Sequence, residues 1–283
     1  MTHSLLGEPL QAPAVDPAQR DVLEMRLAEA LAARERAPSD ELACVWVGRR
    51  LSALNRFDEA VDEFSRGLEQ HPDSYRLLRF RGHRYITLRR FDLAEADLTE
   101  AAALVRRLEY AELEPPTDPD PTKSYPSTIQ HQIYYHLALA RYLRGDFARA
   151  ATAWNDCLRS AGDSPDAICG AVNWYCATLL RLGRRQDAQR LLDEWIRADM
   201  PVREAAGYLR LCLLYKGELA PEELIPADET NQVQRATLSY GLGNFWLVRG
   251  DAARARAAFE QALASPTWMA FGRIAAEAEL ARR

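Results

Sequence analysis

The sequence predicts an all-α protein, a solenoid of antiparallel helix pairs, from three observations. The pentapeptide Arg-Phe-Asp-Glu-Ala at 56–60 returns as Arg-Phe-Asp-Leu-Ala at 90–94, a spacing of 34 residues. Gly48 and Gly82 are also 34 residues apart. A small residue continues the series at Ala60, Ala94, Ala150, Ala188 and Ala255. A period of this length is typical of helical arrays, in which each unit buries its apolar face against its neighbours.

Each unit is expected to contain two helices joined by a short turn. The turn is marked by Asn55, Gly145, Gly183 and Gly250, residues that accept the left-handed conformation which ends a helix. Asp146 and Asp251 follow two of these glycines, and aspartate favours the start of the next helix. The two Arg-Gly-Asp triplets are therefore interpreted as helix turns rather than as integrin ligands.

Residues 41–74 carry the clearest repeat motif. They place Val47, Gly48 and Leu51 on the first helix and Ala60, Phe64 and Pro72 on and after the second. This pattern resembles the tetratricopeptide repeat, which has small and large apolar residues in these slots. The resemblance recurs at 75–108, 131–164, 169–202 and 236–269. It implies a right-handed superhelical solenoid of about six repeats with terminal capping helices.

Insertions between the units divide the chain into segments. Pro221 and Pro226 are expected to disturb the second helix of one unit, since proline breaks helices. The expected segments are a disordered or extended tail (1–15), an N-terminal capping helix (16–40), repeats 1 and 2 (41–108), an acidic Pro-rich insertion (109–130), repeats 3 and 4 (131–202), a degenerate repeat 5 (203–235), repeat 6 (236–269) and a C-terminal capping helix (270–283). The insertion is expected to be a surface loop or a lid that folds over the concave face.

Composition argues against several classes of partner. The net charge of −5 does not fit nucleic acid, which normally requires a basic excess. No run approaches the 18–20 or so apolar residues of a membrane helix, and the start has no signal-peptide pattern. The five cysteines, Cys44, Cys157, Cys169, Cys176 and Cys212, form no C-x-x-C pair and are expected to be reduced, packed thiols. We expect a cytoplasmic protein without a metal site or cofactor.

Catalytic motifs are missing from the sequence. It contains no Gly-rich phosphate loop, G-x-S-x-G or H-E-x-x-H motif. His131 and His136 are five residues apart, which places them poorly for binding one metal ion from a helix. We expect a protein that is not an enzyme.

The concave groove is the expected binding site. The resemblance implies that one stripe of first-helix residues lines it. The groove candidates are Arg49, Arg79, His83, Gln132, Tyr135, His136, Tyr142, Asn173, Trp174, Arg181, Tyr208, Tyr240 and Asn244, and Tyr215 lies on the same stripe. Aromatic, arginine and amide side chains are the usual anchors of protein interfaces. The alternative is that several of the aromatic side chains only fill gaps between neighbouring first helices.

The resemblance also allows one specific activity to be tested. Co-chaperone members of the family hold a terminal carboxylate with a Lys, Asn and Arg clamp. The matching positions here are Val45, Arg49, Phe80, Gln132 and His136, which hold one permanent cation and no Asn, so that mode is not expected.

Three hypotheses about function remain. The first is a protein–protein interaction adaptor or scaffold that binds a peptide segment or helix of another protein in the groove. The second is an architectural or self-associating repeat protein without a groove ligand. The third is an enzyme or small-molecule sensor that uses Arg79, His83 and His136.

Overall fold

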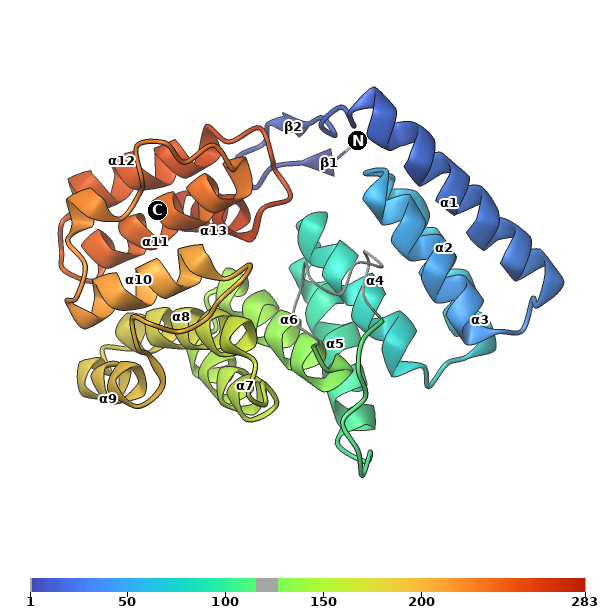
Figure 1. Cartoon of the computed structure of the whole chain (residues 1–283), viewed down its shortest axis with the longest axis horizontal. Coiled ribbons are helices and arrows are strands. Elements are labelled where there is room, and N and C mark those ends of the chain that lie inside the picture. The colour runs from blue at the N-terminus through green and yellow to red at the C-terminus, as the bar shows by residue number, and fades with distance from the viewer. Residues whose placement is uncertain (1, 116–126, 283) are drawn as a thin grey trace. The chain divides into compact units, whose positions relative to one another are not determined.

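The structure is a computed structural model that describes residues 2–115 and 127–282 (Figure 1). These residues form two compact units, each described here by itself. The first unit holds residues 2–3 and 9–111, and the second holds residues 4–8, 112–115 and 127–282. Thirteen α-helices make up most of the described residues, which confirms the all-α repeat fold.

The first unit contains a short hairpin and five helices. The expected tail at 1–15 holds two antiparallel strands, in which Thr2 pairs with Leu10. The elements are β1 (Thr2–His3), β2 (Pro9–Leu10), α1 (Pro17–Arg36), α2 (Glu41–Ala53), α3 (Phe57–Gln70), α4 (Tyr75–Thr87) and α5 (Phe91–Val105). Helix α2 pairs with α3, α4 pairs with α5, and α1 packs against α2.

The second unit continues the same scheme. Its elements are α6 (Ile129–Arg144), α7 (Phe147–Arg159), α8 (Pro165–Arg181), α9 (Arg185–Trp195), α10 (Ala206–Lys216), the 3-10 turn η1 (Pro221–Glu223), α11 (Gln232–Leu247), α12 (Ala252–Leu263) and α13 (Phe271–Ala281). Helices α6 and α7, α8 and α9, and α11 and α12 form the pairs. The first helix of every pair is therefore α2, α4, α6, α8 or α11, and α10 stands alone.

Polar caps start the first helices. The side chains of Asp40, Ser74, Thr128, Ser164 and Asn231 each accept a hydrogen bond from a backbone N–H of the first turn. Such bonds satisfy donors that the helix itself leaves unpaired. The first helix of each pair thereby has a defined start at a similar position in the repeat.

Left-handed residues end the first helices, as the sequence predicts. Asn55, Gly145, Gly183 and Gly250 have φ angles of 60°, 84°, 73° and 84°. Arg89 takes the same conformation, with φ of 61°, at the position one period after Asn55. Sequence reasoning missed Arg89 because arginine carries no preference for this conformation.

A small residue on the first helix is followed, 16 positions later on the second helix, by a large residue. The pairs are Gly48 and Phe64, Gly82 and Leu98, Ala138 and Trp154, Cys176 and Leu192, and Gly243 and Phe259. A Cβ atom on Gly48 would lie 2.2 Å from Cε1 of Phe64, and one on Gly243 would lie 2.4 Å from Cδ1 of Phe259. The two helices of a pair cross closely enough there to require glycine.

Two segments depart from regular pairing. After α10, residues 217–231 form only the turn η1, whose position agrees with the prolines at 221 and 226. The ends of the 109–130 insertion pair with each other: Leu113 and Thr128 form an antiparallel bridge, and the Glu114 N–H donates to the Ser127 carbonyl at 2.8 Å. The middle of the insertion, residues 116–126, lies outside the described residues, so the lid hypothesis for 109–130 stays a prediction.

All five cysteines are buried and free, in agreement with a packing role. Over the two described ranges, no helix is both long enough and apolar enough to cross a lipid bilayer.

Candidate functional site

Every predicted groove residue lies on a first helix or on α10. Arg49 is on α2, and Arg79 and His83 are on α4. The others are Gln132, Tyr135, His136 and Tyr142 on α6, Asn173, Trp174 and Arg181 on α8, Tyr208 on α10, and Tyr240 and Asn244 on α11. Since the two units are separate bodies, the candidates form two groups.

Most of these candidates are buried inside their own unit. The buried residues are Arg49, Arg79, His136, Tyr142, Asn173, Trp174, Tyr240 and Asn244. His83, Gln132, Tyr135, Arg181 and Tyr208 are partly exposed. The buried aromatic side chains contact one another between helices, as the alternative to a groove role predicts.

Within the second unit, aromatic side chains from α6, α8 and α11 contact one another. The Tyr142 and Tyr240 hydroxyls are hydrogen-bonded at 2.6 Å. Trp174 stacks on Tyr240 with ring centroids 5.5 Å apart, and on Trp154 at 6.3 Å. Burial, followed by the charge of Glu279, raises the pKa of Tyr142 to about 12. These tyrosines are therefore neutral hydrogen-bonding groups in a closed interior.

A second contact joins α6 to α10 and α13. The Tyr135 hydroxyl donates to the Tyr208 hydroxyl at 3.2 Å. The ring of Phe271, at the start of α13, lies 6.3 Å from the ring of Tyr135 and 5.7 Å from that of His136. The inner face of α6 is thus covered by another part of the same unit.

The far end of α13 is held by charge. The Arg181 Nη1 lies 2.5 Å from Glu279 Oε1, and Arg282 Nη1 lies 2.6 Å from the same oxygen. Arg282 also donates to the Tyr142 carbonyl at 3.0 Å. The Glu279 side chain is 3% exposed, so this is a buried ion pair with a shared carboxylate.

Helix α13 therefore runs along the inner face of the second unit. Its first residue contacts the middle of α6, and its last turn contacts the C-terminal ends of α6 and α8. The sequence predicts only a terminal cap for 270–283, and it points to neither Phe271 nor Glu279 as a contact of the groove candidates. Seven of the eleven residues of α13 are buried. In this unit, α13 contacts four of the predicted groove residues, Tyr135, His136, Tyr142 and Arg181.

In the first unit, arginine side chains stack on aromatic rings of α2 and α4. The Arg49 guanidinium lies 4.5 Å from the ring centroid of Trp46 and 5.0 Å from that of Phe80. Arg79 lies 4.3 Å from the Phe80 ring, and its Nη1 is 3.4 Å from Nδ1 of His83. Cations are attracted to the faces of aromatic rings, so these rings hold the guanidinium groups against the surface of α2 and α4.

Charge is segregated between the two helix layers of the first unit. Helices α2 and α4 contain two and four arginines, six in all, against one glutamate. Helices α3 and α5 contain five and four acidic residues, nine in all, against one arginine. The first-helix layer is thus cationic, although the whole chain is acidic.

Two of these arginines have pKa values below their usual range. Burial, followed by the charge of Arg79, lowers the pKa of Arg84 to about 9. Burial, followed by the charge of Arg26, lowers the pKa of Arg50. An anion placed near these groups would relieve the repulsion between the like charges.

The described residues contain no cluster of three or more His, Cys, Asp or Glu side chains able to hold a metal ion. Burial raises the pKa of Cys169 to about 12, so its thiol is a poor nucleophile at neutral pH.

Known proteins are similar to this chain in sequence and in structure. Residues 48–109 and 132–164 each match a model of the tetratricopeptide repeat. A tetratricopeptide repeat protein from Parabacteroides merdae is similar in structure, with 13% identity, a TM-score of 0.51, and coverage of 91% of this chain and 94% of that one. A chain of the APC/C hetero-tetramer Cut9–Hcn1 has 15% identity and a TM-score of 0.50 over 86% of this chain, which spans 36% of that longer chain. No curated protein matches the sequence.

The fold and the repeated crossing of small and large residues define a helical-repeat protein. The chain is a tetratricopeptide-repeat protein. This fold is a scaffold for protein–protein interaction.

Proposed function

We propose that this protein is a non-enzymatic adaptor that binds an acidic peptide segment of a partner protein on the first helices of its N-terminal unit. The proposal rests on the charge segregation in that unit, where α2 and α4 carry six arginines and one glutamate. In the second unit, α13 contacts several of the groove candidates, which favours the N-terminal unit as the binding site.

The chemistry of this surface favours carboxylates. Arg49 and Arg79 lie against aromatic rings, and His83 lies beside Arg79. Guanidinium groups bind carboxylates with paired hydrogen bonds, and aromatic rings supply apolar area for the rest of a peptide. Of the predicted groove residues, Arg79 and His83 are the two assigned to the binding of the segment.

The test is a titration of the full chain with labelled peptides, followed by fluorescence anisotropy. Two unstructured 15-residue peptides of equal apolar content are compared, one with glutamates and one with lysines at the charged positions. The acidic peptide should bind at least tenfold more tightly, and its affinity should fall as salt rises. Arg79→Gln combined with His83→Gln should weaken it at least tenfold, while Arg66→Gln on the exposed face of α3 should not. Equal binding of both peptides would refute the proposal.

The architectural alternative is favoured by one observation, namely that α13 already occupies the inner face of the second unit. In that case the chain would self-associate and bind neither peptide. Light scattering over a hundredfold range of concentration distinguishes the two: a constant monomer mass with acidic-peptide binding supports the adaptor, and a mass that rises without peptide binding supports self-association.

A further inference from the structure

Helix α1 stands in the place of a second helix, and the described residues before it, 2–16, form the strands β1 and β2 rather than a first helix. It packs against α2 as α3 packs against α4. A shift of 34 residues superimposes its positions on those of α3, so that Ala30 corresponds to Phe64 and Ala33 to Gly67. The array thus begins with half a repeat, a feature that the sequence analysis describes only as a cap.

One period later, the equivalent positions all contact the first helix α2. Phe64 packs on Gly48 so closely that a Cβ there would overlap the ring. Phe80, which corresponds to Trp46, lies under the Arg49 guanidinium at 5.0 Å. Arg76 Nη1 pairs with Glu41 Oε2 at 3.3 Å. In the next repeat, the equivalent position beside the second helix α3 is therefore occupied by a first helix, α2.

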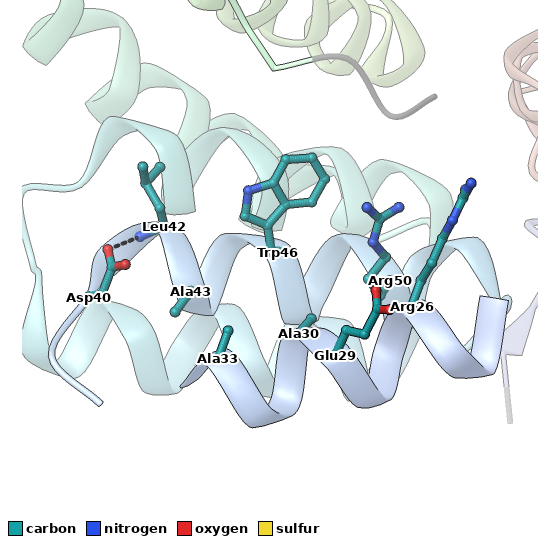
Figure 2. A pocket seen from close by; sticks show the side chains of 9 residues that line it. All are labelled: Arg26, Glu29, Ala30, Ala33, Asp40, Leu42, Ala43, Trp46 and Arg50. Atoms are coloured by element: carbon teal, nitrogen blue, oxygen red, sulfur yellow. Dashed lines mark hydrogen bonds between the residues drawn. The ribbon is translucent and has the colours of Figure 1, made fainter. Parts of the chain in front are cut away.

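At the start of the array, the equivalent position beside α1 is open. A hollow of about 410 Å³ lies between α1 and α2, with Trp46 at its centre (Figure 2). Ala30 and Ala33 form its α1 wall, and Leu42 and Ala43 lie on the α2 side. Leu42 is 43% exposed, unusually high for a leucine beside a tryptophan. Ala30 is small where its equivalent one period further on, Phe64, is a large aromatic residue.

The charge at one end of the hollow defines the occupant further. Arg26 from α1 and Arg50 from α2 lie at the same end, and Arg50 also stacks on Trp46 at 4.8 Å (Figure 2). Glu29 is the acidic side chain at that end of the hollow. Two cations face one anion, so a carboxylate from an occupant would balance the excess charge.

We propose that this hollow binds an amphipathic helix of a partner protein, which takes the place of the missing first helix. Apolar side chains of the partner helix, spaced three and four residues apart, contact Trp46, Ala30 and Ala33. It carries carboxylates in its C-terminal half, over Arg26 and Arg50, because successive first helices run parallel. This site is separate from Arg79 and His83, which the proposed function assigns to an extended segment.

The probe is a labelled 16-residue helical peptide, with leucines along one face and two glutamates in its C-terminal half. Binding to the full chain is followed by anisotropy, and helix formation by circular dichroism. Ala30→Phe should fill the hollow, as Phe64 fills the next repeat, and weaken binding at least tenfold. The matched control is Ala28→Phe, an exposed position on the same helix. Thermal melts of both variants test whether they fold.

Reversing the charge of Arg50 tests its contact with the carboxylates of the bound helix. Arg50→Glu should weaken the glutamate peptide at least tenfold and strengthen a peptide with lysines at those two positions. Arg79→Gln with His83→Gln should leave helix binding unchanged, so this proposal can fail or hold independently of the proposed function. Equal binding by Ala30→Phe and the native chain, or equal binding of a proline-interrupted peptide, would overturn it. A dimer of the chain that dissociates in the Ala30→Phe variant would also overturn it, because the hollow would then hold a second copy of the chain.

Discussion

At the scale of single residues, the close helix crossings explain why glycine recurs in the repeat. Gly48 and Gly243 each face a phenylalanine ring that is at most 1% exposed. Gly170, by contrast, sits in α8 where a Cβ would make only ordinary contact, 3.5 Å from Tyr135 Cε2. The same residue type therefore has two different structural meanings.

This difference predicts opposite effects of two identical substitutions. Gly48→Ala should lower the free energy of unfolding by about 1–3 kcal/mol through overpacking against Phe64. Gly170→Ala should raise it by up to about 1 kcal/mol, because alanine favours the helix and finds room. Chemical denaturation of the two variants measures both values. A neutral or stabilising Gly48→Ala would contradict the crossing geometry.

His131 is a buried group whose ionisation opposes folding. It is 3% exposed, and its Nδ1 donates to the Cys157 carbonyl at 3.1 Å. Burial lowers its pKa to about 4, against an ordinary value of 6.5. The unfolded chain therefore binds a proton between pH 6.5 and 4 that the folded chain does not.

Stability should accordingly fall as the pH drops through this window. The contribution of His131 is at most about 1.4 kcal/mol per pH unit. His131→Gln should flatten the decline in the free energy of unfolding between pH 7 and 5, measured by urea denaturation, whereas His3→Gln in the exposed tail should not. An unchanged slope in His131→Gln would exclude this group as the cause.

At the scale of elements, α13 is the helix whose role differs most from the sequence expectation. Its sequence, rich in alanine, suits a cap, and alanine does not indicate which surface a helix covers. The direction comes from Phe271 and Glu279, which reach α6 and α8. Residues roughly 100 to 140 positions apart in sequence must meet for these contacts, so no local pattern predicts them.

The Arg181 and Glu279 pair should couple α8 to α13 measurably. A double-mutant cycle with Arg181→Ala and Glu279→Ala should give an interaction energy of about 1–3 kcal/mol, because the carboxylate is buried. The control pair is Arg256 and Glu260 on α12, whose side chains are 65% and 53% exposed. That pair should give less than about 0.5 kcal/mol. Equal coupling in the two cycles would show that burial of the first pair adds nothing.

At the scale of the whole molecule, the two repeat matches lie in different compact units, residues 48–109 in the first and 132–164 in the second. In repeat arrays, stability is a sum of terms within units and between nearest neighbours. Damage to one repeat should therefore remain local.

Hydrogen exchange tests this expectation. Gly48→Ala should accelerate amide exchange in α2, α3 and α4 and leave α11 and α12 unchanged. Gly243→Ala should produce the reverse pattern, because its crossing with Phe259 lies in α11 and α12. Equal acceleration throughout the chain in either variant would show that the molecule opens as one cooperative body.

The sequence by itself determined the repeat, the helix pairs and most of their turns. These features depend on local conformation and on fixed spacing, such as Asn55 at a turn and Gly48 sixteen residues before Phe64. Only the tertiary structure decided which first-helix side chains are covered. Tyr142 and Trp174 look like groove anchors in sequence, yet they pack against Tyr240. Burial depends on how successive repeats curve and on where α13 lies, and both follow from contacts between residues far apart in the chain.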